Sequence, residues 1–141
     1  MSDAPRLSLA DLAARIARNP FNVWLGAQIE SASVTGVCVR VPWRDELYGN
    51  ASVKAIHGGV LGCLIDTCGS YSVIAQTGET ALTVDYRVDL HRSTGGKALL
   101  ARGEIVKHGR TLSVVDVRVV DADEQLVASG RVVVLNVARK P

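Results

Sequence analysis

The sequence predicts one α+β domain in which a curved antiparallel sheet of about five to six strands wraps a long central helix. The stretch from Val60 to Gln76 carries a single formal charge, on Asp66. A helix that is apolar nearly all round is normally buried on several sides. The segments after it read as strands without intervening helices, which argues against a doubly wound parallel fold. With 141 residues, 48% of them hydrophobic, the chain can bury one such core.

The remaining elements follow from hydrophobic periodicity and from turn residues. An amphipathic N-terminal helix starts with Ser8 and Asp11 in the positions of a capping box. We expect a single domain over residues 1–141, with this helix inside 1–20 and the core inside 24–137. The predicted elements are a helix at 8–19, strands at 24–31 and 34–41, a polar irregular segment at 42–52, the long helix at 58–75, and strands at 81–91, 97–107, 111–121 and 125–137.

The strand at 81–91 alternates between apolar and polar residues along its whole length, so it should have one dry face and one polar face. Thr83 falls on the polar face of this strand. The following two strands form a hairpin through residues 108–110. The residues of the predicted dry face are Leu82, Val84, Tyr86, Val88 and Leu90.

Composition narrows the class of function. The net charge of +2 and the aromatic content of 4% do not favour a nucleic-acid surface. The three cysteines, Cys38, Cys63 and Cys68, have no metal-binding spacing and are expected to be free thiols, so no metal site is predicted. The first six residues are polar and lack the apolar core of a signal peptide. We therefore expect a cytoplasmic protein.

The pattern His57-Gly58-Gly59, followed by Asp66, predicts acyl-transfer chemistry. The N–H groups of Gly58 and Gly59 at the start of a helix can bind a carbonyl oxygen that becomes negative during reaction. A lone carboxylate in an apolar helix can act as general base or as nucleophile. At about 100° and 1.5 Å per residue, His57 and Asp66 lie on opposite sides of the helix and roughly 13 Å apart. A two-fold dimer would bring the helix start of one subunit to the acid of the other.

These residues also carry a resemblance to a known family. From about Trp24 to its C-terminus, the chain resembles the hotdog-fold acyl-CoA thioesterases of the phenylacetate-pathway (PaaI-like) type. The matching motifs are Asn50, His57-Gly58-Gly59, Asp66, Thr83-Val84-Asp85-Tyr86, Lys107-His108-Gly109-Arg110-Thr111-Leu112 and Ala128-Ser129-Gly130-Arg131.

The resemblance implies hydrolysis of acyl-CoA thioesters by a homodimer, often assembled as a dimer of dimers. Gly58 would polarise the thioester carbonyl, with His57 and Asn50 shaping that side of the site. The partner subunit's Asp66 would activate or deliver the nucleophile, and Thr83 would hold water beside it. CoA is part of the substrate, so no separate cofactor is implied. The residues expected along the CoA moiety are Gly59, Lys107, His108, Gly109, Arg110 and Thr111.

Three features leave alternatives open. Asn50 lies one residue further from His57 than the family spacing and is nearly as well explained as a cap of its own turn. Thr83 lies on the polar face of its strand, where a local bend could change its direction. The Lys107–Leu112 segment also fits an exposed hairpin tip. The cations considered for the CoA phosphates are Lys107, His108, Arg110, Arg92 and Arg131.

Two other functions remain compatible with the sequence. One is a hydratase or dehydratase on the same scaffold, which would need a histidine placed to move protons on the acyl chain. The other is a module that binds acyl-CoA without catalysis. The acyl group is left open between an aromatic group and a medium aliphatic chain.

Overall fold

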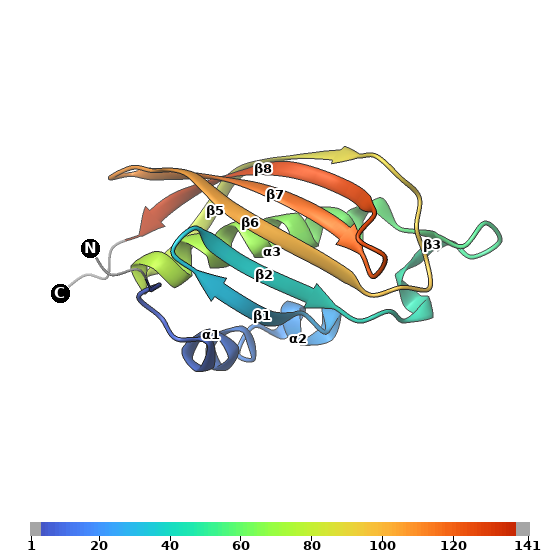
Figure 1. The fold of residues 1–141 in the computed structure, drawn as a ribbon, viewed down its shortest axis with the longest axis horizontal. Helices are drawn as coiled ribbons and strands as arrows, with labels where there is room; N and C mark the ends of the chain where they lie inside the picture. The colour runs from blue at the N-terminus through green and yellow to red at the C-terminus, as the bar shows by residue number, and fades with distance from the viewer. Residues whose placement is uncertain (1–3, 138–141) are drawn as a thin grey trace.

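The computed structural model describes residues 4–137 as a curved six-stranded sheet that wraps around one long helix (Figure 1). The helices are α1 (Leu9–Ile16), α2 (Pro20–Leu25) and α3 (Gly58–Thr77), with a 3-10 turn at Asp45–Leu47. The strands are β1 (Gln28–Ser33), β2 (Gly36–Val41), β3 (Tyr48–Asn50), β4 (Ala55–Ile56), β5 (Thr80–Leu90), β6 (Leu99–His108), β7 (Leu112–Asp121) and β8 (Leu126–Val137).

The main sheet has the order β1-β2-β6-β7-β8-β5, and every neighbouring pair is antiparallel. Helix α3 packs on the concave face against β2, β5, β6, β7 and β8, and α1 covers β1 at one edge (Figure 1). At the other edge, β8 is the only strand that pairs with β5 within residues 4–137. The predicted fold class is confirmed.

Helix α3 forms where the sequence places its start and stop signals. His57 caps its N-terminus, and Gly78 ends it with a left-handed φ of 72°. By length and composition α3 could cross a membrane, but 67% of its apolar window is buried inside the domain. That burial is the property of a core helix, because the sheet supplies the apolar surroundings.

Two glycines of α3, Gly62 and Gly69, face the sheet, and only Gly69 leaves no room for a side chain. A Cβ at Gly69 would lie 2.6 Å from the Cβ of Val132 on β8. The Val132 Cβ is bonded directly to the backbone, so a change of rotamer cannot move it away. A Cβ at Gly62 would have its nearest contact with Tyr86 at 3.6 Å, an ordinary van der Waals distance. The close approach of α3 to β8 therefore depends on position 69.

This difference predicts opposite effects of two glycine-to-alanine changes. Alanine in a helix interior gains about 1 kcal/mol over glycine, so Gly62→Ala should raise the free energy of unfolding by up to that amount. Gly69→Ala adds the strain of an overpacked contact, about 1–3 kcal/mol, and should lower it. Denaturant unfolding at matched protein concentration measures both values. Equal effects of the two changes would contradict the packing described.

The predicted strand at 24–31 is wrong in its first residues, because Trp24 and Leu25 belong to α2. The side chain of Asn19 accepts the Asn22 N–H, Pro20 occupies the first helical position, and Gly26 ends the helix with φ 78°. These capping signals outweigh the β propensity of the short apolar segment. The predicted capping box of Ser8 and Asp11 in α1 is confirmed. The segment expected to be irregular also contains the short β3, which pairs with β4.

The uninterrupted alternation expected for strand 81–91 is also wrong. The pairing of β5 with β8 shifts register between Thr83 and Asp85, as happens when a bulge adds one residue to a strand. Thr83 and Tyr86 lie opposite Val134 and Val132, which are both buried on the helix side. Paired residues point to the same face, so the bulge turns Thr83 as well as Tyr86 toward α3.

Candidate active site

The N-terminus of α3 presents an unpaired backbone donor. His57 is the N-cap residue, and its Nδ1 accepts a hydrogen bond from the Gly59 N–H at 2.8 Å. The Val60 N–H is bonded to the His57 carbonyl oxygen. Within residues 4–137 the Gly58 N–H has no acceptor. It therefore stands at the positive end of the helix as a donor for a negatively charged oxygen.

This geometry changes the roles expected for His57 and Gly59. The His57 ring caps the helix, and the Gly59 N–H, expected to share the oxyanion, is occupied by that ring. A Cβ at position 59 would lie 2.8 Å from His57 Nδ1, so the cap needs a glycine there. The expected pair of donors is reduced to the Gly58 N–H.

Asp66 lies on a stripe of α3 that the sheet leaves partly uncovered. Its side chain is half-buried, while the helix positions on either side of it along the sequence, Ile65 and Thr67, are buried. The stripe consists of Gly59, Cys63, Asp66 and Ser70. These residues are spaced by four, three and four positions, which places them on one face of the helix.

One oxygen of Asp66 is held by the bulged strand. The Thr83 hydroxyl donates to Asp66 Oδ1 at 2.6 Å, and Thr83 Oγ1 also lies 2.9 Å from Ser70 Oγ. Asp66 Oδ2 has no hydrogen-bond partner among residues 4–137 and is not a buried unpaired atom. The carboxylate is thus fixed through one oxygen and free to accept a proton through the other.

The thiol beside Asp66 is not a competing nucleophile. Burial, and after it the negative charge of Asp66, raise the pKa of the Cys63 thiol above its ordinary value. The thiolate is the reactive form, so this thiol stays protonated and weakly nucleophilic near neutral pH. Of these two side chains, the Asp66 carboxylate is therefore the candidate base or nucleophile.

The donor and the acid do not meet within one protomer. Gly58 and Asp66 are eight residues apart on the same helix, which corresponds to about 12 Å along its axis. Each has a neighbour on β5. A Cβ at Gly58 would lie 3.0 Å from Leu90, whereas Asp66 is bonded to Thr83. The two halves of the site therefore lie at separate positions along the same edge strand.

Asn50 is bound to its own loop. Its Oδ1 accepts hydrogen bonds from the Ser52 N–H at 3.1 Å and from the Ser52 hydroxyl at 2.6 Å. This is the turn-capping arrangement that the sequence left open as an alternative. Strand β3, which carries Asn50, nevertheless packs against His57, because a Cβ at Gly49 would lie 3.0 Å from the His57 Cα.

The β6–β7 hairpin lies at the opposite end of the domain from Gly58. Asn136 donates from its backbone N–H to the Thr111 carbonyl and from Nδ2 to the Gly109 carbonyl. Asn136 is itself paired with Ala81 at the start of β5, next to the C-terminus of α3. Within one protomer, the hairpin and the oxyanion donor are therefore apart. Lys107 and Arg110 are exposed there.

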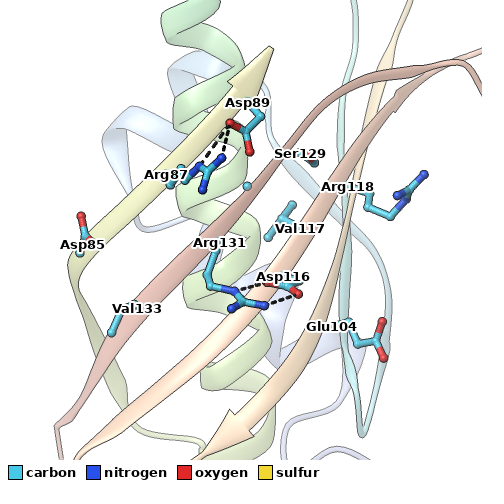
Figure 2. A pocket seen from close by; sticks show the side chains of 11 residues that line it. Asp85, Arg87, Asp89, Glu104, Asp116, Val117, Arg118, Ser129, Arg131 and Val133 are labelled. Carbon is cyan, nitrogen blue, oxygen red and sulfur yellow. Dashed lines mark hydrogen bonds and ion pairs between the residues drawn. The ribbon is translucent and has the colours of Figure 1, made fainter. Parts of the chain in front are cut away.

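A hollow on the outer face of the sheet does not contain Asp66 (Figure 2). It has a volume of about 590 Å³ and is lined by charged side chains of β5, β6, β7 and β8. The Arg131 guanidinium donates two hydrogen bonds, of 2.6 and 2.8 Å, to the Asp116 carboxylate, and Arg87 forms an ion pair with Asp89 (Figure 2). Because Arg131 is paired on this outer face, it is a poor candidate for the CoA phosphates.

Comparison with known proteins identifies the family. A model of the thioesterase superfamily matches residues 54–128, which include the α3 N-terminus, Asp66 and Thr83. The chain belongs to the thioesterase superfamily. The family resemblance seen in the sequence is confirmed at this level.

Individual proteins that are similar to this chain agree with this. A candidate esterase of Halobacterium salinarum is 30% identical over 119 residues, covering 77% of this chain and 78% of that protein. A crystal structure of another thioesterase-superfamily protein is 37% identical, with a TM-score of 0.86 over 90% of this chain and 97% of that one. The Escherichia coli PaaI protein of the phenylacetic acid degradation operon shares the fold, at 23% identity and TM-score 0.80 over 93% and 97% of the two chains.

Ser70 is the site residue that the sequence did not single out for a role. A hydroxyl four residues after an acid on one helix face is a signal that could have suggested it. Its importance depends on Thr83 facing the helix, however, and the bulge that turns Thr83 inward is a property of the strand pairing.

Proposed function

We propose that this thioesterase-superfamily protein hydrolyses acyl-CoA thioesters at the interface of a homodimer. The observation that supports it is a pair of groups on the same helix, about 12 Å apart, that have no hydrogen-bond partner among residues 4–137: the helix N-terminal donor Gly58 N–H and the carboxylate oxygen Asp66 Oδ2. Either half alone is incomplete. A second copy supplies the missing half to each.

The edge strand β5 supports pairing with a second copy. It is 11 residues long, and on one side it has no strand partner among the residues that the structure describes. Four of its apolar side chains are between 46% and 60% exposed, namely Leu82, Val84, Tyr86 and Leu90. A long edge with exposed apolar residues pairs with another chain unless it is covered. We therefore place the homodimer on antiparallel β5–β5 pairing; a further dimer of dimers stays a prediction.

The positions of the two half-sites along β5 suggest the register of this pairing. A two-fold axis between Tyr86 and Arg87 sets Leu90 of one strand opposite Thr83 of the other. Because Leu90 lies beside Gly58 and Thr83 holds Asp66, this register brings each Gly58 N–H toward the partner's Asp66. It also brings the β6–β7 hairpin, at the Thr80 end of β5, beside the partner's α3 N-terminus. Lys107 and Arg110 would there face the phosphates of CoA.

In the proposed mechanism, each group has its own role in hydrolysis. The Gly58 N–H binds the thioester carbonyl oxygen and stabilises the negative charge that forms on it. Asp66 takes a proton from water as the water oxygen attacks the carbonyl carbon, or attacks that carbon directly with its own oxygen. The C–S bond then breaks, and the departing thiolate is protonated to give free CoA. In the first route the acyl group leaves as the carboxylic acid, and Asp66 returns the proton taken from water to the thiolate. In the second route the acyl group is left as a mixed anhydride with Asp66, which a water molecule then hydrolyses to the free acid and the free Asp66 carboxylate.

Replacing Gly58 tests the oxyanion donor. Proline is favoured at the first position of a helix, and His57 has the extended backbone, with ψ 127°, that a following proline requires. Gly58→Pro should therefore keep the helix while removing the N–H. We expect kcat to fall about 100- to 1000-fold, measured by thiol release. Gly58→Ala keeps the N–H and is the control; equal losses in both variants would contradict the donor role.

The alternative functions have less support. A hydratase needs a histidine that transfers protons to the acyl chain, and His57 is engaged in capping α3. His91 bonds to Ser129 and His108 to Ser113. Neither contact involves α3.

A panel of aromatic and aliphatic CoA thioesters, assayed for free thiol, tests the proposed reaction and identifies the acyl group. Loss of enoyl-CoA absorbance without thiol release would favour hydration instead. Binding of CoA esters without any thiol release would favour a non-catalytic module.

A further inference from the structure

We propose that Ser70 is a positioning residue that directs the Thr83 proton onto Asp66, and this inference rests on the proposed function. Three oxygen atoms lie in sequence from α3 to β5 and back: Ser70 Oγ, Thr83 Oγ1 and Asp66 Oδ1, at 2.9 and 2.6 Å. They come from two positions on one helix face and from the strand bulge that faces it.

The direction of the protons follows from counting them. A carboxylate can only accept, so the single proton of the Thr83 hydroxyl is donated to Asp66. Thr83 Oγ1 then has only lone pairs to offer Ser70, which makes Ser70 the donor in the 2.9 Å contact. Each hydroxyl thus has one consistent orientation, from Ser70 to Thr83 to Asp66.

Ser70 also departs from the usual behaviour of a hydroxyl in a helix. Ser72 and Thr77 of α3 donate to the carbonyl oxygens four residues earlier, those of Cys68 and Val73, at 2.8 and 3.0 Å. This local bond is the common choice for Ser and Thr inside a helix. Ser70 instead faces the hydroxyl on β5. Its contact therefore crosses between elements and ties the acid-bearing stripe to the bulge.

The consequence is a carboxylate with one oxygen fixed and one oxygen free. Without Ser70, the Thr83 hydroxyl loses the donor that fills its lone pair, and a water molecule can compete for that place. Thr83 would then spend less time donating to Asp66, and Asp66 Oδ2 would be held less well toward the substrate. Such misplacement lowers the rate of the chemical step more than it weakens substrate binding.

The test is a double-mutant cycle measured as kcat and KM on the best CoA thioester. A neutral hydrogen bond of this kind corresponds to about a three- to tenfold effect. We expect Ser70→Ala to lower kcat by that factor with little change in KM, and Ser70→Thr to retain activity. In a Thr83→Val background, Ser70→Ala should cause no further loss, because Ser70 acts through Thr83. Thr77→Ala removes another hydroxyl of the same helix and should leave kcat unchanged.

Full activity of Ser70→Ala, or losses that multiply in the double variant, would overturn the proposal. Thermal unfolding separates a folding defect from a kinetic one, and the Ser70→Thr variant decides the matter if Ser70→Ala unfolds. Asp66→Asn distinguishes this failure from that of the proposed function. If Asp66→Asn is inactive while Ser70→Ala is fully active, only the role of Ser70 is wrong.

Discussion

Asp66→Asn should lower kcat about 100- to 10,000-fold, the range expected when a general base or nucleophile is removed. Asparagine keeps an oxygen that can accept the Thr83 hydroxyl, which lies 2.6 Å from the carboxylate, so the local geometry should persist. The change removes only the negative charge and the basicity. Thiol release from a CoA thioester measures the effect.

The control for this variant is Asp85→Asn. Asp85 is an exposed carboxylate on the outer face of β5, two residues beyond Thr83 and pointing away from α3. It should retain near-normal turnover and the same thermal midpoint as the parent protein. Near-normal turnover by Asp66→Asn on the best substrate would show that another group performs the chemistry.

Mixed dimers should recover activity from two inactive proteins. In the proposed dimer, each site combines the Gly58 N–H of one protomer with Asp66 of the other. A heterodimer of a Gly58→Pro chain with an Asp66→Asn chain has one site in which both groups are intact. Half of the dimers formed at random from equal amounts are mixed, and each has one working site of two. The mixture should therefore show about a quarter of the parent activity.

Co-refolding the two inactive variants, with each refolded alone as the control, measures this recovery. If both groups of a site came from one protomer, the mixed dimer would have no intact site and the mixture would stay inactive. A tagged version of one variant allows the heterodimer itself to be isolated and assayed. Light scattering on the same samples reports whether β5 edges associate in solution.

Much of this architecture could be predicted because its signals are local. The long apolar stretch with one charge indicated a buried helix, and the glycine at its end and the histidine at its start marked its limits. The alternating segments after it indicated strands. The short α2 was missed because its few apolar residues also fit a strand, and the capping role of Asn19 became clear only in the folded chain.

The site was predicted in part for the same reason. Gly58 and Asp66 could be singled out because a glycine at a helix start and a lone acid in an apolar helix are unusual in any context. His57 was expected to line the site, and its ring also caps α3 next to Gly58. Asn50 turned out to bond within its own loop. Both side chains had a local partner within two residues, and sequence spacing alone does not show which partner wins.

The sequence by itself determined which residues form the core helix, where that helix begins, and that it carries a single acid. The tertiary structure decided which groups surround that acid. The pairing of β5 with β8 places a bulge at Thr83–Asp85 and turns Thr83 toward the helix. A bulge depends on how two strands distant in sequence align, because one extra residue reverses the direction of every side chain before it relative to those after it. No local pattern in residues 80–90 specifies that alignment.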